Sequence, residues 1–246
     1  NYIESEWWAL KEIWKKGLLY KGFKIVPYCP RCGTPLSSHE VAQGYKQVKE
    51  RSAIVRFKVK DEDAYFLAWT TTPWTLPSNV GLCMNPDDTY VKVKAADGYT
   101  YYLAEALADK VLGGLAEEGK PAYEVLEKYV GKDLEYKEYE PLFACAGEAA
   151  AKQHKKGFYV TVDNYVSMSD GTAPAFGEDD GRVGRKYDLP FVQFVDGKGN
   201  MTAETPYAGM FVKKADPEVL KDLDAEGKLF DAPKFEHDYP FCWRCD

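Results

Sequence analysis

The sequence contains no hydrophobic run long enough to span a bilayer and no recognisable secretory leader. It has no internal repeat and no low-complexity segment. It also lacks an excess of positive charge, because 32 Lys and Arg residues stand against 39 Asp and Glu, for a formal net charge of -7. A protein that gripped nucleic acid across its whole surface would be basic, so any such contact must be local. We expect a cytosolic protein that does not enter a membrane.

The chain does have the material for a large folded domain. Its 246 residues are 45% hydrophobic and 15% aromatic, which provides a substantial core and disfavours disorder. Alternating side chains predict a strand over 53–59, and Asp97-Gly98 predicts a β-hairpin. We predict further strands over 64–71, 158–162 and 192–195, and helices over 5–16, 104–112, 123–129 and 216–224. This mixture favours a β-rich, barrel-like α+β domain with peripheral helices over a regular βαβ series.

The cysteines do not have the pattern of a secreted disulfide framework. Four of them form two CxxC pairs of matching form, YCPRCG at 28–33 and FCWRCD at 241–246, while Cys83 and Cys145 stand alone. Two such pairs can supply the four thiolates of a tetrahedral zinc site, which would be structural because no ligand position stays open. The alternatives are a redox dithiol in each pair, or unpaired thiols. We favour zinc, because duplicated pairs of matching form rarely arise by accident.

A shared zinc would pin the two ends of the chain together, since nearly the whole sequence separates the two pairs. We therefore divide the chain into an N-terminal connecting segment (1–46), a central domain (47–232) and a return segment (233–246). His39 and His237 lie near the pairs in sequence, but four thiolates need no further ligand. We expect both histidines to be ordinary surface residues.

The stretch WTTTPWTLPSN, residues 69–79, places three consecutive threonines at the end of an apolar strand, where Pro73 stops strand pairing. Hydroxyl groups gathered at such a turn can recognise a polar ligand, because each both donates and accepts hydrogen bonds. The alternative is simpler. Threonine is a good strand former, and a threonine-rich strand end is usually only a strand end.

A second stretch, DGTAPAFGEDDGRVGRKY at 170–187, runs from a turn through Ala-Pro into three acidic residues. If Glu178, Asp179 and Asp180 occupy the first turn of a helix, the helix dipole favours their ionised forms. An ionised carboxylate at a pocket edge suits the ammonium group of a ligand, and the basic residues that follow would lie near any phosphates. An ordinary helix start with a solvated basic face is the alternative.

These stretches, lying between the pairs YCPRCG and FCWRC, closely resemble the editing insertion of isoleucyl-tRNA synthetase. The resemblance covers essentially the whole chain, from NYIESEWWALKEIW to the last pair. The valine and leucine enzymes are similar in layout, but they carry an arginine after two threonines, where this chain has Thr72-Pro73-Trp74. The resemblance implies hydrolysis of the ester in valyl-tRNA(Ile), with valyl-adenylate as a second candidate substrate.

The resemblance also implies roles for single residues. Asp180 would bind the α-ammonium of the substrate and orient the ester, while Asn79 and Thr72 would help to hold the substrate and place the attacking water. No general base is implied. The implied substrate-binding residues are Thr70, Thr71, Thr72, Trp74, Asn79, Asp180 and Tyr239. The implied ligands of a structural zinc ion are Cys29, Cys32, Cys242 and Cys245.

One departure from the family pattern concerns activity. The family usually reads GTGxVHxAPAFGEDD, whereas this chain reads GTAPAFGEDD at 171–180, so about five residues are absent, the length of a short strand. A true deletion would remove a strand and a histidine beside the site and put the activity in doubt. Alternatively, a short loop is missing from the sequence as written, and Thr172 is not bonded to Ala173. The intact pattern on both sides favours the second interpretation.

Neither HIGH nor KMSKS, the ATP-handling signatures of the synthetase family, occurs in this chain. We therefore expect no amino-acid activation here, and we interpret the chain as an excised insertion. The implied partners are the valine-carrying 3′ end of tRNA(Ile) and the remainder of the synthetase, with the fragment itself a monomer. A zinc-stabilised tRNA-binding module without hydrolytic activity is the rival hypothesis.

Overall fold

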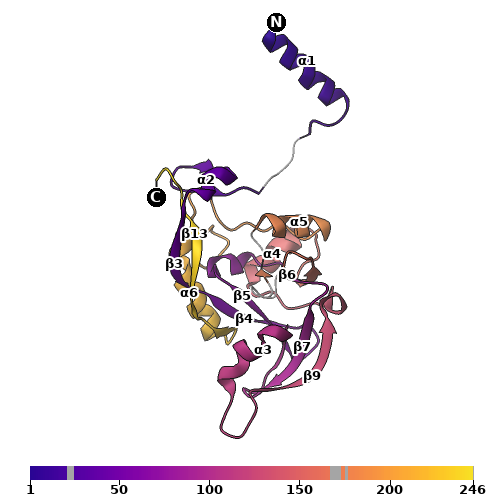
Figure 1. The fold of residues 1–246 in the computed structure, drawn as a ribbon, viewed down its shortest axis with the longest axis vertical. Helices are drawn as coiled ribbons and strands as arrows, with labels where there is room; N and C mark the ends of the chain where they lie inside the picture. Colours follow the sequence, from indigo (N-terminus) through magenta and orange to yellow (C-terminus); the bar gives the residue numbers. More distant parts are fainter. Residues whose placement is uncertain (21–24, 167–172, 175–176, 246) are drawn as a thin grey trace.

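A computed structural model describes residues 1–20, 25–166, 173–174 and 177–245 of the protein. Its largest sheet has six strands in the order β12-β4-β5-β8-β7-β9 (Figure 1). Neighbouring strands pair in antiparallel fashion except β5 and β8, which are parallel. The strands are β4 (Ala53–Lys58), β5 (Tyr65–Thr70), β7 (Thr89–Ala95), β8 (Thr100–Ala104), β9 (Tyr123–Val130) and β12 (Leu229–Asp231).

The alternation predicted for 53–59 is confirmed in β4. Ala53, Val55 and Phe57 are essentially fully buried, while the residues between them are only half-buried. The predicted hairpin is also confirmed, since β7 and β8 pair across Asp97-Gly98. Gly98 adopts φ of +90°, a conformation that disfavours a side chain, and the Tyr99 amide donates to Asp97 Oδ1 over 3.0 Å.

A second, three-stranded sheet lies against the first and shares its core. Its order is β10-β6-β11, with β6 (Gly81–Met84) parallel to β10 (Tyr159–Val162) and antiparallel to β11 (Ala173–Pro174). Leu82 and Val160 of this sheet belong to the same hydrophobic cluster as Val55 and Phe66 of the larger one. The predicted sheet-rich α+β class is confirmed, although the described strands form separate sheets and do not close into a barrel.

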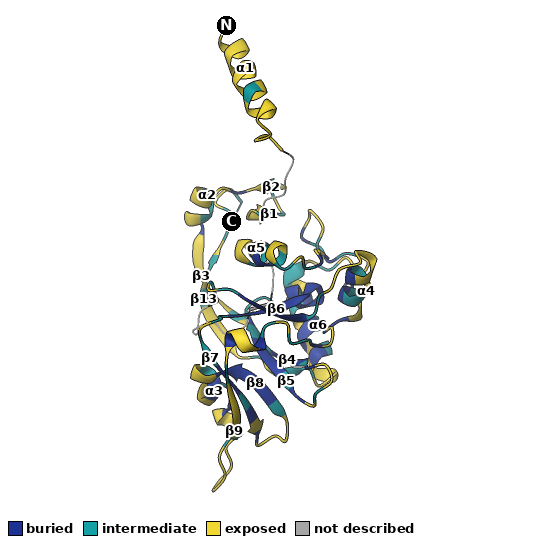
Figure 2. Ribbon diagram, turned by 90° about the vertical axis from the view of Figure 1, so that its right-hand side faces the viewer, coloured by how far each residue is buried: buried dark blue, intermediate teal, exposed yellow. Residues whose placement is uncertain are grey.

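Helices cover the margins of the sheets (Figure 2). The amphipathic helix α6 (Val212–Ala225) buries Ala215, Val219 and Leu223, and it packs against the 3₁₀ helix η1 (Pro73–Ser78). The other helices of the body are α3 (Glu105–Leu112), η2 (Gly113–Leu115), η3 (Gly131–Leu134), α4 (Ala144–Lys152) and α5 (Glu178–Lys186).

A two-stranded ribbon connects this body to the two ends of the chain. Strand β3 (Tyr45–Arg51) pairs with β13 (Lys234–Pro240) over seven residues, and the short α2 (Ser38–Ala42) lies at the top of the ribbon (Figure 1). The first CxxC pair lies in a small hairpin of β1 (Tyr28–Cys29) and β2 (Thr34–Pro35).

The N-terminal helix α1 (Tyr2–Lys15) extends away from the body, and none of its residues is buried (Figures 1 and 2). Its position confirms the helix predicted over 5–16, which begins three residues earlier than expected. Trp7, Leu10 and Trp14 are all exposed. No helix of the described residues is both long enough and apolar enough to cross a membrane.

Three predicted elements are wrong in part. Residues 123–129 form the edge strand β9 and not a helix, because the edge of β7 offers backbone partners along its length, with one irregularity between Lys92 and Val93, to a segment rich in Tyr and Val. Residues 192–195 make only an isolated bridge, Val195 with Met201. Helix α6 begins at Val212 instead of Asp216, since the Phe211 carbonyl accepts the first helical hydrogen bonds and Pro217 lies inside the helix.

Candidate functional site

The four cysteines of the two CxxC pairs meet at the top of the ribbon. All four sulfur atoms lie within 4.8 Å of one another, with Cys29 Sγ 3.5 Å from Cys245 Sγ and Cys32 Sγ 3.8 Å from Cys242 Sγ. No disulfide joins them. The Cys32 amide donates to Cys29 Sγ over 3.3 Å, a bond that stabilises a thiolate.

This cluster fits a zinc ion. Four sulfurs placed at about 2.3 Å from a tetrahedral Zn²⁺ lie roughly 3.8 Å apart, close to the spacing found here. All four ligand positions would be filled by protein, so a metal bound here would hold the chain together without touching a substrate. Among the described residues the cluster contains the four cysteines and neither His39 nor His237. His39 is exposed, whereas His237 is half-buried and stacks on Phe235, so it is not the ordinary surface residue that we expected.

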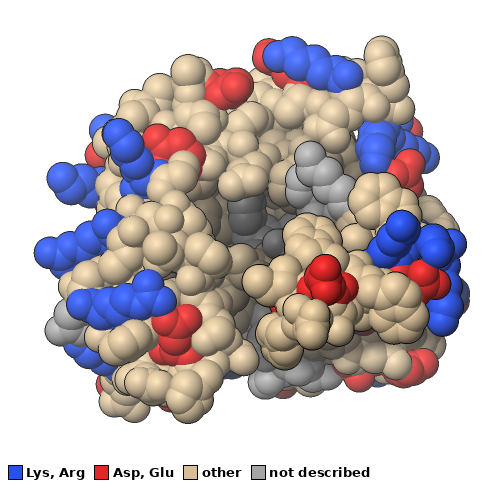
Figure 3. Space-filling view, turned by 90° about the horizontal axis from the view of Figure 1, so that it is seen from above, with Lys and Arg blue, Asp and Glu red and all other residues tan. Residues whose placement is uncertain are grey.

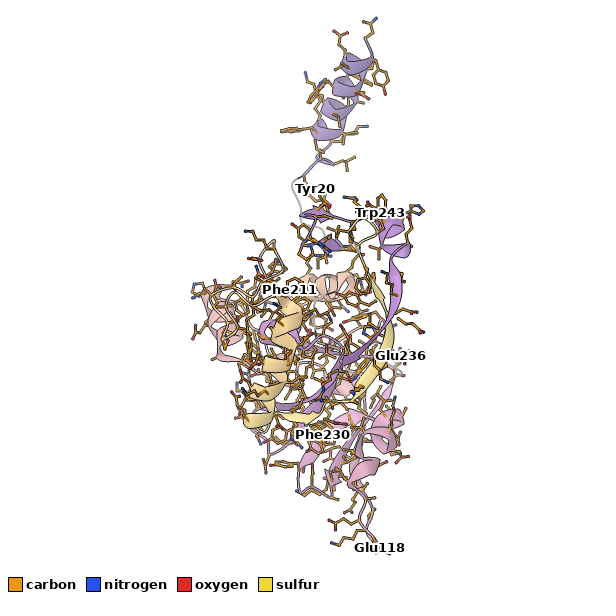
Figure 4. All side chains as sticks on the ribbon, turned by 90° about the vertical axis from the view of Figure 1, so that its left-hand side faces the viewer. Tyr20, Glu118, Phe211, Phe230, Glu236 and Trp243 are labelled. Carbon is orange, nitrogen blue, oxygen red and sulfur yellow. The ribbon has the colours of Figure 1, made fainter. Side chains whose placement is uncertain are left out.

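Polar contacts dock helix α2 onto the second CxxC pair. Glu40 Oε1 accepts a hydrogen bond from Trp243 Nε1 over 3.0 Å and another from Arg244. Hydrogen bonding to the Ser37 amide, and then to Arg244, lowers the pKa of Glu40 to about 2. Trp243 accordingly lies beside α2 in Figure 4. These bonds fix the loop that carries Cys242 and Cys245.

The threonine stretch leaves the sheet at the end of β5. Thr70 is buried, and its hydroxyl oxygen lies 3.3 Å from that of Thr72 and accepts the Thr72 amide over 3.1 Å. The Thr72 carbonyl in turn accepts the hydroxyl of Thr75 over 2.8 Å. Thr71 is half-buried. Two hydroxyl groups therefore gather where the strand turns into η1.

Helix α6 anchors the same turn and connects it to Tyr239. The Trp74 amide donates to Asp216 Oδ1 over 2.8 Å, and Lys213 Nζ lies 3.9 Å from Asp216 Oδ2. Lys213 Nζ also lies 4.9 Å from the centre of the Tyr239 ring on β13. Burial outweighs these two favourable contacts and raises the pKa of Asp216 to about 6. Trp74 and Tyr239, both predicted to line the site, are thus joined through one helix.

Asn79 lies inside the protein at the end of η1. It is 1% exposed; its Nδ2 donates to the Gly81 carbonyl over 3.0 Å, and its Oδ1 accepts the Tyr139 hydroxyl over 2.6 Å. Burial raises the pKa of Tyr139 well above its usual value, so this hydroxyl stays protonated and donates. Both ends of the Asn79 amide are therefore engaged with protein, and its contact with a substrate stays a prediction.

The three acids of the second stretch lie in the first turn of α5, as predicted. Asp180 Oδ2 accepts the Gly177 amide over 2.6 Å, and Asp180 Oδ1 accepts the hydroxyl of Tyr165. The first basic side chain after these acids, that of Arg182, is paired with carboxylates and is not simply solvated. Arg182 makes two bonds of 2.9 Å to Asp163 and one of 3.2 Å to Asp179.

Strands β11 and β6 bring the two stretches together in the fold. Strand β11, which leads into α5, packs beside β5 and pairs with β6, and β6 begins two residues after Asn79. Two surface hollows lie elsewhere, one lined by residues around Lys94 and Lys120 and one by residues around Lys60 and Lys156. Thr172 lies outside the described residues, so the structure does not test the prediction about its bond to Ala173.

On the face that carries α1, the ribbon and α5, the described residues form no large surface of one charge. In Figure 3 the Lys and Arg side chains lie mainly at its margins, with Asp and Glu among them. This mixed distribution agrees with the formal net charge of -7.

Sequence reasoning missed three residues that support the site: Tyr139, Tyr165 and Asp216. Asp216 stands at the start of the helix predicted over 216–224, and its carboxylate accepts the Trp74 amide. Nothing in the local sequence marks Tyr139 or Tyr165, because their partners lie 60 and 15 residues away along the chain.

Comparisons with known proteins agree on one family. The model of the class I tRNA synthetases (I, L, M and V) matches residues 1–195. The isoleucine–tRNA ligases of Clostridium novyi and Thermus thermophilus are 53% and 45% identical over 253 and 256 residues. Each match covers 100% of this chain but 23% of the relative, so the chain spans about a quarter of their length. An alignment over 253 positions also leaves at least seven positions where this 246-residue chain has no residue.

Solved structures match the fold at low identity. The structure named GlLeuRS-CP1 has a TM-score of 0.55 at 13% identity and covers 75% of this chain and 99% of that one. The editing domain of the cytosolic leucyl-tRNA synthetase of P. knowlesi has a TM-score of 0.53 at 14% identity, with coverage of 79% and 99%. The fold of the chain is therefore that of these domains.

Proposed function

Because the chain belongs to the class I tRNA synthetases, we propose that it is the editing unit of an isoleucine–tRNA ligase and hydrolyses the ester of valyl-tRNA(Ile). Valyl-adenylate is a second candidate substrate. The solved structures that share its fold are named as editing domains or as the CP1 segment of leucyl-tRNA synthetases. Amino-acid activation would belong to the part of the relatives that this chain does not span.

The chemical need for such a unit comes from the similarity of the two amino acids. Valine lacks one methylene of isoleucine, and a pocket shaped for the larger side chain cannot exclude the smaller one. Isoleucyl-tRNA synthetase is itself the standard illustration, with a discrimination of only about 150-fold. A second pocket, too small for isoleucine, can destroy the valyl ester that passes the first.

The observation that carries the proposal is that β11 packs beside β5 and pairs with β6. The threonine hydroxyls lie at the end of β5, and the Asp180 carboxylate lies in the helix that follows β11. A small polar ligand with an ammonium group and hydroxyl groups suits these donors and acceptors.

Within this proposal Asp180 binds the α-ammonium of the valyl group, and Thr70, Thr71 and Thr72 hold the ester and the terminal adenosine. Asn79 helps to place the substrate and the attacking water. The network orients water against the carbonyl carbon; the ester C–O bond breaks, and valine and free tRNA are released. Trp74 and Tyr239 line the pocket. We assign no general base, because a carboxylate that holds an ammonium is an orienting group.

We further propose that the four-cysteine cluster binds structural zinc, and that residues 47–232 form the editing domain between the segments 1–46 and 233–246. The partner is the 3′ end of tRNA(Ile), and binding by the isolated chain is weak because most tRNA contacts belong to the rest of the synthetase. A monomer in the cytosol is the expected form.

The test is incubation of the protein with valyl-tRNA(Ile) and, separately, with isoleucyl-tRNA(Ile), followed by measurement of released amino acid. We expect release of valine and retention of the isoleucyl ester. Loss of a charge-assisted hydrogen bond to the substrate, about 1.5–3 kcal/mol, predicts that Asp180→Ala slows valine release by roughly 10- to 150-fold.

Asp179→Asn is the matched control, since Asp179 lies in the same turn but bonds to Arg182. It should retain wild-type release. If both esters persist with wild-type protein while tRNA still binds, the chain is instead a zinc-stabilised tRNA-binding module, a result that a true deletion before Ala173 would explain. Full activity in Asp180→Ala would remove Asp180 from the site.

A further inference from the structure

The side chain of Asp180 is held from outside its own helix by Tyr165. The Tyr165 hydroxyl donates to Asp180 Oδ1, while the Gly177 amide, at the start of α5, donates to Asp180 Oδ2. Each oxygen of the carboxylate thus has a donor, and the two donors come from different segments.

The ring of Tyr165 is packed in a small apolar cluster behind α5. Cys83, Val166 and Val183 form the buried part of this cluster, and Tyr165 and Tyr187 pack against it. Cys83 belongs to β6, and its burial raises the pKa of that thiol to about 11. A tyrosine ring held in this way has little freedom, so its hydroxyl is presented to Asp180 in a defined direction.

The loop that carries Tyr165 is attached to α5 independently of that hydrogen bond. Arg182 of α5 makes two parallel bonds of 2.9 Å to the carboxylate of Asp163, two residues before Tyr165. Paired bonds between a guanidinium and a carboxylate fix both distance and orientation. Removal of the Tyr165 hydroxyl should therefore leave the loop and the helix in place.

We propose that Tyr165 is a positioning residue for the editing reaction. It holds the Asp180 carboxylate in the orientation that receives the α-ammonium of the aminoacyl group, and it does so without contact with the substrate. The inference rests on the proposed function, since it assigns a role to Tyr165 only if Asp180 binds the ammonium. Through Asp180, Tyr165 thus contributes to the selection of ligands that carry an α-amino group.

The test compares two stable ligands. In one, L-valine is joined by an amide bond to 2′-amino-2′-deoxyadenosine; in the other, 3-methylbutanoic acid replaces valine and the α-amino group is absent. We expect Tyr165→Phe to weaken binding of the first ligand by roughly three- to tenfold, the usual worth of one hydrogen bond, and to leave binding of the second unchanged. Calorimetry or competition with valyl-tRNA(Ile) measures both affinities.

The matched control is Tyr187→Phe. Tyr187 packs against the same cluster, but its hydroxyl bonds to Glu135 and to the backbone of Val162. Its loss should not change the ratio of the two affinities. In an Asp180→Asn background, Tyr165→Phe should have no further effect on the amine-bearing ligand, because a neutral amide no longer attracts the ammonium.

The outcomes separate the inference from the function on which it rests. If wild-type protein binds both ligands alike and releases no valine, the proposed function fails, and the role of Tyr165 with it. If wild-type protein prefers the amine and Tyr165→Phe keeps that preference, the role of Tyr165 alone is overturned. Equal weakening of both ligands by Tyr165→Phe would also overturn it, since that result indicates a general structural effect.

Discussion

At the scale of single residues, the buried hydrogen bond between Tyr139 and Asn79 fixes the Asn79 side chain of the predicted site. The Tyr139 hydroxyl is enclosed in the core and donates to Asn79 Oδ1. Asn79→Ala leaves that hydroxyl without its acceptor, which costs about 1–3 kcal/mol of the free energy of unfolding. Urea denaturation measures this loss, and valine release from valyl-tRNA(Ile) is measured on the same sample.

Tyr139→Phe is the companion variant, because it removes the hydroxyl without changing Asn79. The double variant should lose less stability than the sum of the two single variants, since no unpaired hydroxyl remains in the core. An Asn79→Ala protein with unchanged stability and lost activity would refute this picture and show that the amide serves the substrate alone.

Residues that belong to a local pattern could be predicted from the sequence, and residues whose partners are distant could not. The CxxC pairs and the acidic turn at Asp180 can be recognised in the sequence, because a CxxC pair and a helix start are each built from a few consecutive residues. Tyr165 and Asp216 act through partners that only the tertiary structure brings near. Their role therefore appears once the strands and helices are placed.

At the scale of elements, the interface between α6 and η1 contains a titratable group, the carboxyl of Asp216. Asp216 is partly enclosed between the two, and burial raises its pKa to about 6, despite the Trp74 amide and Lys213. The folded protein thus holds this proton more tightly than the unfolded chain, whose Asp pKa is about 3.9. The resulting stabilisation is present below pH 4 and is lost as the pH rises through 6.

The prediction is that Asp216→Asn removes this dependence. Asparagine keeps an oxygen for the Trp74 amide. The free energy of unfolding of the variant, relative to that of the wild type, should therefore rise between pH 4 and pH 7 by at most about 3 kcal/mol. Urea denaturation at several pH values measures the difference. Asp224→Asn, at an exposed position of the same helix, controls for the lost charge; parallel curves for the two variants would contradict the prediction.

Element types were predictable where the side-chain pattern and the burial agree, as in β4 and the β7–β8 hairpin. They were not predictable at β9. Its sequence YEVLEKYV has apolar residues at spacings compatible with either a helix or a strand, and the unpaired edge of β7 decides between them. The bounds of α6 were wrong for a similar reason, because burial of its apolar face extends the helix before Asp216.

At the scale of the whole molecule, the two CxxC pairs meet because β3 and β13 run side by side to the cysteine cluster. This ribbon is a sheet of its own that touches the body through side chains such as Phe235, which packs on Trp69 of β5, while the core is held by its own apolar contacts. Gly44, just before β3, lies where the chain passes Phe241, the residue before Cys242, and the Phe241 amide donates to the Gly44 carbonyl over 2.8 Å.

Gly44→Ala should therefore weaken zinc binding more than it weakens the core. A Cβ atom at Gly44 would lie 1.9 Å from the Phe241 carbonyl oxygen and 2.9 Å from its carbon, so the backbone next to Cys242 must shift. A strain of about 1.4 kcal/mol or more in the zinc-bound form corresponds to a loss of tenfold or more in affinity. Competition with a chromophoric chelator measures that affinity, and circular dichroism after chelation follows the core.

Gly113→Ala is the matched control, because an added Cβ there meets no atom within 4 Å. It should bind zinc as the wild type does. If Gly44→Ala retains wild-type zinc affinity, the approach of the two segments is looser than described, and the ribbon does not set the geometry of the cluster. If chelation instead unfolds the large sheets together with the ribbon, the metal is part of the stability of the body, and the division of the chain at residues 47 and 232 loses its basis.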